Sequence, residues 1–369
     1  MSDRCFCNNC LIQNNHPGVD FNSENICAIC TGRLTDRLTK NYNYISDNYN
    51  TFISDDTKRQ YDYMLMLSGG KDSIFMLHKL LKETSKTPLA YTYDHPFESK
   101  NAQKNVKKVI DKLEIDHIKS TANSKYKKLM RAIFTSQKDP ASAKYNSEKI
   151  PCILCSYYIM VNACIFAYKF NIPYVLYCAD PMQMVASMSD VRMILRLYTD
   201  ELGKSFCEEI FGDHYNLFLD ENNPSVPQII FPYVSMINNY NAESIIDELM
   251  KAGLYETSPI ETSCALYPLL QLYSYMNYDC NFYTLEYASS VRNKVWHRDM
   301  ALALNERYKN MIFSVSNGEI NEKEIREVIA GLHLGAQKSD EYMYQSIINF
   351  KQSMDLLGIK FNGKNMEVI

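Results

Sequence analysis

A short glycine-rich segment carries the residue types that bind phosphate. It runs Ser68-Gly69-Gly70-Lys71-Asp72-Ser73. Two adjacent glycines let a backbone turn tightly and approach an anion, and the free amides at the start of a following helix favour negative charge. The lysine adds a cation and the two serines add hydroxyl donors. The spacing of the kinase and GTPase P-loop is absent, so the segment predicts a phosphate-binding loop of another type.

Two pairs of cysteines near the N-terminus have metal-ligand spacing. Cys7 and Cys10 form one C-x2-C knuckle, and Cys27 and Cys30 form another. Four thiolates at this separation can enclose one tetrahedral Zn²⁺, and such a closed site is structural because no ligand position is left for a substrate. Cys5 is an alternative ligand, and a cluster of reduced thiols without metal is the simpler interpretation.

A further pair, Cys152 and Cys155, falls inside the expected catalytic domain at the start of a helix. A helix N-terminus lowers the pKa of a thiol, which suits a metal ligand or a nucleophile. Two buried thiols or a second structural zinc site are the alternatives.

Strands and helices alternate around the phosphate loop. Apolar runs predict strands at 63–67, 88–93 and 172–178, with a further strand beginning at 116, and helical spacing predicts helices after the loop, at 101–113 and at 156–170. This alternation is typical of a doubly wound α/β fold with a parallel sheet. After residue 233 the chain is mostly helical, with helices expected at 242–252, 290–308, 322–332 and 339–357.

Acidic residues follow two of these strands. Asp94 follows the second strand, and Asp180 follows the strand that ends near Cys178. Ligands gather at this edge of a parallel sheet, and a carboxylate there suits Mg²⁺. A solvated loop carboxylate is the alternative for Asp94.

Length, net charge and cysteine content limit the number of domains and the kinds of partner. With 369 residues the chain can form two or three domains, and a net charge of −4 leaves any RNA contact to a local basic patch. We expect no signal peptide and no membrane span, hence a cytoplasmic protein whose 12 cysteines serve as ligands, reactive thiols or core residues. The expected divisions are a zinc ribbon at 1–40, a linker at 41–60, an ATP-binding domain at 61–240 and a helical domain at 241–369.

The loop resembles the SGGKDS motif of the PP-loop ATP pyrophosphatase superfamily. The resemblance implies that Ser68 to Ser73 hold ATP, that Lys71 and Asp72 act in catalysis, and that AMP is transferred to a substrate oxygen while pyrophosphate leaves. It also implies that Thr92, Tyr93 and Asp94 lie near the adenosine. Related enzymes often have a G-H-N-x-x-D-like segment where this chain has 177–181.

The N-terminal string C-x2-C-L-x5-P-G-V-x-F-x5-C-x2-C resembles the zinc ribbon of the N-acetyl sugar amidotransferase family. A second similarity, to a V-R-x-G-x-x-x-R-x-x-A-L-like stretch, includes Arg292 and Arg298 as anion-binding residues, with Lys294 in place of the glycine. The family implies replacement of oxygen by nitrogen on a sugar or nucleotide sugar. Ammonia would come from a separate glutaminase partner.

Two other functions remain open. Pro151-Cys152-x2-Cys155 resembles a segment of PP-loop tRNA-thiolation enzymes, which implies a 4Fe-4S cluster on Cys152, Cys155 and Cys264, with Cys280 as the alternative third ligand. The resemblance also implies catalytic roles for Cys152 and Cys155, a sulfur donor, and a nucleobase or small molecule as acceptor. The third alternative is a non-catalytic adaptor that senses ATP. The long C-terminal helices suggest a homodimer surface.

Overall fold

The computed structural model describes residues 5–34, 38–136, 147–178, 190–233, 241–256, 264–292, 294, 297–332, 344–345 and 347–369. They fall into two compact units. The sheet unit comprises Asp36–Leu129 and Ile153–Ser258, and the cysteine unit comprises Met1–Thr35, Met130–Cys152 and Pro259–Ile369. Each unit is therefore assembled from separate stretches of the chain.

The sheet unit is built on five parallel strands. They are β1 (Tyr63–Met66), β2 (Pro88–Asp94), β3 (His117–Thr121), β4 (Tyr174–Leu176) and β5 (Gln228–Ile230), in the order β3-β2-β1-β4-β5. Every residue of β1 and β4 is buried, as expected of strands covered on both faces. The predicted α/β class with a parallel sheet is confirmed.

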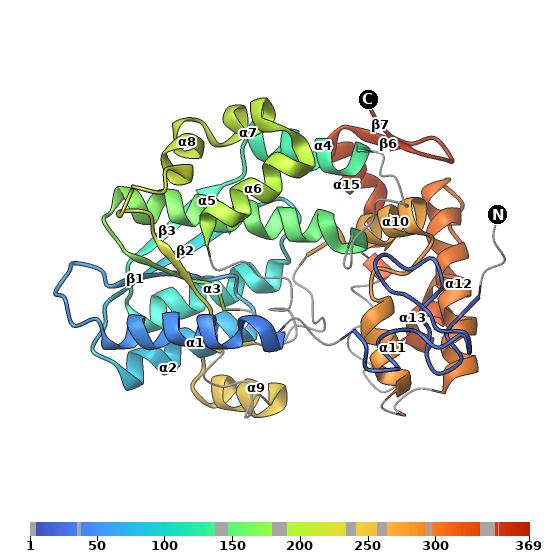
Figure 1. Ribbon diagram of the computed structural model, residues 1–369, viewed down its shortest axis with the longest axis horizontal. Helices are drawn as coiled ribbons and strands as arrows, with labels where there is room; N and C mark the ends of the chain where they lie inside the picture. The colour runs from blue at the N-terminus through green and yellow to red at the C-terminus, as the bar shows by residue number, and fades with distance from the viewer. Residues whose placement is uncertain are drawn as a thin grey trace. The chain divides into compact units, whose positions relative to one another are not determined.

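Helices cover both faces of this sheet. Figure 1 shows α2 (Lys71–Glu83) and α3 (Lys100–Leu113) on one side, and α5 (Ile150–Lys169) and α6 (Val191–Leu202) on the other. The remaining helices of this part of the chain are α1 (Leu38–Ser54), α4 (Ser124–Thr135), α7 (Lys204–Phe211), α8 (Asp213–Leu219) and α9 (Ala242–Lys251). The chain order explains the two layers, because right-handed crossovers in opposite directions from β1 place helices on opposite faces.

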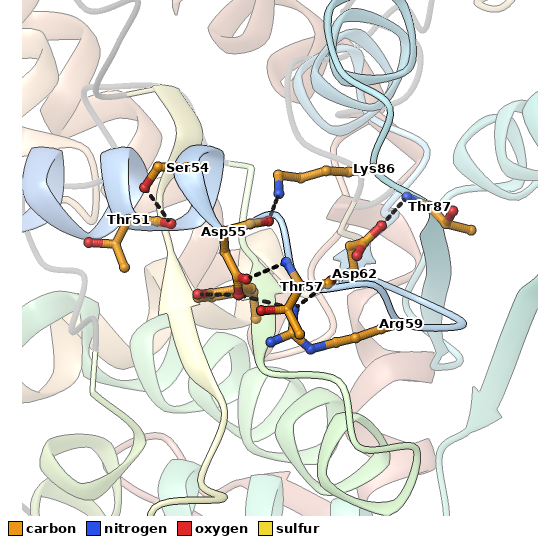
Figure 2. A network of polar contacts seen from close by, with 9 residues as sticks. Thr51, Ser54, Asp55, Thr57, Arg59, Asp62, Lys86 and Thr87 are labelled. Carbon is orange, nitrogen blue, oxygen red and sulfur yellow. Dashed lines mark hydrogen bonds and ion pairs between the residues drawn. The ribbon is translucent and has the colours of Figure 1, made fainter.

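The segment expected to be a linker, 41–60, contains most of α1. Phe52 is fully buried, and its ring contacts Tyr63 at 5.5 Å and Tyr174 at 5.4 Å between centroids. Just beyond the helix, the Asp55 carboxylate accepts hydrogen bonds from the Thr57 amide and the Arg59 guanidinium (Figure 2). It also accepts one from the Tyr174 hydroxyl. The bonds from Thr57 are the main cause that holds the pKa of this carboxyl well below its usual range. Few apolar residues mark this helix, which is why its composition suggested a linker.

Helix α5 corrects one expectation. The helical stretch Ser147–Lys169 is long and apolar enough to cross a membrane by length and composition, although we expected no such segment. Half of the most apolar 18 residues of this stretch are buried. Within the sheet unit, Phe166 packs on Tyr91 of β2 and Tyr158 packs on Tyr93. A helix packed on a sheet and a membrane helix both keep apolar side chains away from water. Length and composition therefore do not separate the two.

The cysteine unit is largely helical. Its elements are a 3-10 turn at Ser147–Lys149, α10 (Tyr267–Tyr278), α11 (Thr284–Arg292), α12 (Arg298–Ser316), α13 (Glu322–Leu332), α15 (Phe350–Leu357) and an antiparallel hairpin of β6 (Ile359–Phe361) and β7 (Met366–Val368). The single helix expected at 290–308 is wrong, since α11 ends at Arg292 and α12 begins at Arg298. Lys294 lies between them with a φ of 58°, in the left-handed region that favours glycine.

Candidate nucleotide loop and metal centre

The glycine-rich loop lies at the point in the sheet where the strand order reverses. It connects the end of β1 to the start of α2, and β1 is flanked by β2 on one side and β4 on the other. The connections that lead to β2 and to β4 run to opposite sides of β1, which leaves a crevice for a ligand at the carboxyl end of β1. Gly70 is the N-cap residue of α2 and provides no side-chain cap. The predicted strand, loop and helix are therefore present in the predicted order.

Hydrogen bonds within the loop fix its shape. The Ser68 amide donates to Oγ of Ser73 at 3.3 Å, and this hydroxyl donates to the Gly70 carbonyl at 3.1 Å. The Gly70 amide lies 3.4 Å from Oγ of Ser68. The two serines thus close the turn at both ends, in addition to offering hydroxyls to a ligand.

Gly69 is required by both its conformation and its surroundings. Its φ is 76°, and a Cβ at this position would lie 2.1 Å from the carbonyl oxygen of Ala102 in α3. No side chain fits against a main-chain atom at that distance. The first turn of α3 therefore packs directly on the loop.

Asn105 of α3 holds the loop from behind and was missed in the sequence. This residue is 1% exposed, and its Nδ2 donates to the Gly69 carbonyl and to the Glu256 carbonyl, each at 3.2 Å. Its Oδ1 accepts the Glu256 amide at 3.0 Å. Asn105 joins the loop to the segment that follows α9. Nothing in a lysine-rich amphipathic helix distinguishes this asparagine beforehand.

The charged residues of the loop form a local pair. Nζ of Lys71 lies 3.1 Å from Oδ2 of Asp72, and both side chains remain partly exposed. The Tyr233 hydroxyl donates to the Asp72 carbonyl at 2.9 Å. Burial raises the pKa of the Cys178 thiol, and the Asp72 carboxylate raises it further. Residues that follow β4 and β5 thus contact or influence the loop, as the sheet order requires.

The three residues predicted to contact adenosine occupy different environments. The Thr92 hydroxyl donates to the Leu67 carbonyl at 2.7 Å and lies 3.0 Å from Nε2 of His117, so it supports the start of the loop. The Tyr93 ring is buried among Tyr126 and Tyr158. Only the third residue, Asp94, lies at the sheet edge with its side chain partly exposed.

Asp94 belongs to a charged group at the end of β2. Its Oδ2 lies 2.8 Å from Nζ of Lys119 and its Oδ1 lies 3.4 Å from Nε2 of Gln103. Nearby, burial and then the charge of Asp94 raise the pKa of the Glu98 carboxyl to about 8. The Glu98 carboxyl therefore favours its protonated form at neutral pH.

The remaining predicted residues do not form one described site. Asp180 lies outside the described residues. Cys152 and Cys155 lie in the first two turns of α5, both partly exposed, with the Cys155 sulfur 3.4 Å from the Tyr126 hydroxyl. Cys155 and Cys264 belong to different units, so the structure describes no arrangement of the three cysteines, and the cluster stays a prediction.

The N-terminal cysteines do converge. The four sulfurs of Cys7, Cys10, Cys27 and Cys30 lie within 4.8 Å of one another, the one such group found in the described part of the chain. The sulfurs of Cys10 and Cys27 are 3.7 Å apart, close to the ~3.8 Å edge of a tetrahedron with 2.3 Å zinc–sulfur bonds. Their shared hydrogen bond lowers the pKa of Cys27 and raises that of Cys10. The donor set fits a tetrahedral metal ion.

Backbone amides also support these sulfurs. The Cys27 amide donates to the Cys7 sulfur at 3.3 Å, and the Cys30 amide donates to the Cys27 sulfur at 3.4 Å. Cys5 is not one of the four and instead accepts a hydrogen bond from Nδ2 of Asn25.

A buried polar pair lies in the same unit. His16, between the two knuckles, is 3% exposed, and its Nε2 is 4.0 Å from the carboxylate of the buried Glu148. Burial lowers the pKa of His16 to about 4, because it outweighs the hydrogen bond with the Pro17 carbonyl, and the charge of Lys149 lowers the pKa further.

Comparisons with known proteins give matches only among solved structures. No family model and no curated protein matches the chain. NMN synthetase from Francisella tularensis is 14% identical over 71% of this chain and 94% of its own, with a TM-score of 0.29. U34-tRNA thiolase NcsA from Methanococcus maripaludis, with its 4Fe-4S cluster, is 13% identical over 73% and 79%, with a TM-score of 0.32.

NH3-dependent NAD synthetase from Campylobacter jejuni is 12% identical over 60% of this chain and 99% of its own, with a TM-score of 0.29. TM-scores this low assign no fold family and no function to the chain.

Proposed function

We propose that the protein is an ATP-dependent transferase that adenylates a substrate oxygen and then replaces this oxygen with nitrogen. The observation that carries the proposal is the loop at residues 68–73, which begins at the carboxyl end of the central strand and leads into α2 without a side-chain cap. Gly70 has no side chain beside the first amides of α2, which leaves room there for a phosphate, while Gly69 lets α3 pack against the loop. The resemblance of the motif to PP-loop ATP pyrophosphatases favours cleavage between the α- and β-phosphates.

In the proposed reaction the chain binds and orients ATP. The amides around Gly69 and Gly70 and the ammonium group of Lys71 hold the phosphates, so that the substrate oxygen attacks the α-phosphorus and pyrophosphate leaves. Asp72, with Asp180 as a further candidate, would hold Mg²⁺, which neutralises charge on the phosphates when bound. Ammonia then attacks the activated carbon, AMP departs with the oxygen, and a proton is released.

The sugar amidotransferase resemblance favours a sugar or nucleotide sugar as the substrate, with ammonia supplied by a glutaminase partner. The convergent cysteines support the part of that resemblance which concerns the N-terminus, because their spacing suits a structural zinc ion. A zinc ion closed off by four thiolates would stabilise the fold and take no part in the reaction.

Sulfur transfer is the second candidate. The partial exposure of Cys152 and Cys155 at the start of α5 favours it, since reactive or ligating thiols must be reachable. With Cys264 they would hold a 4Fe-4S cluster that delivers sulfide to the adenylated substrate. Anaerobic metal and sulfide analysis of wild type beside Cys152→Ala separates the candidates, because only sulfur transfer predicts labile sulfide that the variant loses.

Nucleotide binding tests the loop itself. Lys71→Ala should weaken ATP binding measured by calorimetry by roughly tenfold or more, because a cation on the phosphates is lost. Lys79→Ala is the matched control, since Lys79 lies on the same helix and pairs with Glu83 at 2.6 Å. Equal ATP affinity in the two variants would remove the loop from the proposal.

A further inference from the structure

Arg298, the first residue of α12, binds the main chain of two candidate metal ligands. Its Nε lies 3.2 Å from the carbonyl oxygens of both Cys7 and Cys10, and its Nη2 donates to the Cys7 carbonyl at 2.9 Å. The sequence resemblance assigned this arginine to an anion. The structure instead directs its guanidinium to the first cysteine knuckle. A planar guanidinium can hold two carbonyl groups in a fixed orientation, which a lysine cannot do.

The same knuckle shares a hydrophobic core with the two helices beside it. Cys7, Cys10 and Cys27 are fully buried in one cluster with Ala288 of α11 and with residues of both helices, Val291 and Ala301. The ligands and these helices therefore cannot shift independently. The first residue of α12 is bonded to the knuckle, and the fourth residue of the same helix packs into its core.

Charge gives Arg298 a second effect. Four thiolates around a divalent metal carry a net negative charge, and burying that charge among apolar side chains is costly unless a cation lies nearby. The Arg298 side chain is 29% exposed, so its guanidinium lies at the boundary of the site rather than free in solvent. The guanidinium also lies 3.7 Å from the exposed Asp299 carboxylate, so part of its positive charge remains to offset the charge of a metal–thiolate centre beside the two carbonyls that it binds.

We propose that Arg298 is a positioning residue that couples metal binding at the four cysteines to the packing of α11 and α12. The proposal rests on the metal site described above. It predicts that a bound metal stabilises the helices through this arginine, and that loss of the arginine weakens retention of the metal.

The test uses the full chain loaded with zinc. The variants are Arg298→Gln, which lacks the charge, and Arg298→Lys, which keeps the charge without the planar fork. Arg307→Gln is the matched control, because Arg307 lies on the same helix, is exposed and pairs with Glu327 at 3.2 Å. The rate of zinc transfer to a colorimetric chelator is measured together with hydrogen exchange of the α12 amides, before and after zinc removal.

Arg298→Gln should release zinc roughly 10- to 100-fold faster than wild type, as expected for a residue that orients metal ligands. Arg298→Lys should be intermediate, and Arg307→Gln should match wild type. Zinc removal should accelerate exchange along α12 strongly in wild type and less in Arg298→Gln. If Arg298→Gln does not fold, the release rate of Arg298→Lys decides.

Equal release rates in all variants, or α12 exchange that does not respond to zinc in wild type, would overturn the proposal. A wild-type protein that binds no metal through these cysteines would instead overturn the metal site on which it rests. The ATP loop is unaffected by either result.

Discussion

The two candidate sites use different chemical groups, since one is formed by the main chain and the other by side chains. The loop of the sheet unit uses main-chain amides, two glycines and the start of a helix, and hydrogen bonds of its own serines hold its shape. The cysteine site uses four side chains from two knuckles, and its sulfurs become equivalent ligands only when their protons are lost. The sheet and α3 hold the loop in place, whereas the cysteine site would depend on a bound ion to bring its four thiolates together.

This difference determines how each site should fail. A defect in the loop should abolish nucleotide binding while leaving the cysteine unit folded. Loss of the metal should destabilise the cysteine unit while leaving the loop able to bind phosphate. Each experiment below tests one side of this contrast.

Metal removal should have the largest effect. Structural zinc sites contribute ~10 kcal/mol or more of apparent binding free energy, which becomes folding free energy when the site forms only in the native state. We expect chelation, or Cys27→Ser, to expose residues 5–34 and α11 to rapid hydrogen exchange. Cys207→Ser is the control, since Cys207 is buried outside the cysteine group. Loss of ATP binding on chelation would contradict the independence of the two sites.

Gly69→Ala should have the next largest effect. The new Cβ would lie 2.1 Å from a backbone oxygen of α3, so the loop must move, and we expect ATP affinity to fall at least tenfold and the unfolding temperature to decrease. Gly70→Ala is the steric control, because its Cβ would meet only the Ser68 side chain at 3.5 Å. Calorimetry and thermal unfolding measure both effects. A Gly69→Ala protein as stable as Gly70→Ala would show that the loop is not held against α3.

Acid should act on the cysteine unit through His16. Its pKa is about 4 in the folded protein and near 6.5 when unfolded, so the unfolded chain binds more protons between these values. Stability is then complete above pH 6.5 and falls as the pH decreases to 4, by about 3 kcal/mol for this group.

Denaturant unfolding at several pH values tests this dependence. His16→Asn should flatten the slope between pH 6.5 and 4, whereas substitution of the exposed His297 should not. An unchanged slope in His16→Asn would assign the acid sensitivity to other groups.

Lys294→Gly should give the smallest effect, and it should be stabilising. Lys294 has a φ of 58° between α11 and α12, where a side chain is disfavoured and glycine is not. We expect a gain of roughly 0.5–1 kcal/mol after the entropy of glycine is included, measured by denaturant unfolding. Lys323→Gly, at an exposed position in the first turn of α13, should lose stability instead. A loss of stability in Lys294→Gly would show that the Lys294 side chain contributes to the turn.

The sequence was most informative where the hydrophobic pattern and residues with particular roles, such as glycine and cysteine, predict the same structure. The strands and helices around the loop were predicted because buried strands form continuous apolar runs and because a glycine pair has few uses besides a tight turn. Convergence of the four cysteines followed from their spacing. These signals are local, so no tertiary knowledge was needed to interpret them.

The residues that were missed act over long sequence distances. Asn105 contacts Gly69, 36 residues away, and Glu256, 151 residues away, and neither contact leaves a local pattern. Tyr233 reaches the loop only because β5 joins the same sheet as β1. Arg298 was named in the sequence but assigned to an anion, because its contact with Cys7 joins residues 291 positions apart. The break between α11 and α12 was missed because a lysine occupies a position where glycine would have signalled a turn.

The products formed from ATP test the central claim most directly. Purified protein, incubated with ATP, Mg²⁺ and candidate acceptors, is followed by phosphorus NMR beside Lys71→Ala and Lys79→Ala. The account predicts AMP and pyrophosphate from wild type and Lys79→Ala, and neither from Lys71→Ala. Formation of ADP and phosphate, or AMP production that does not need Lys71, would contradict it.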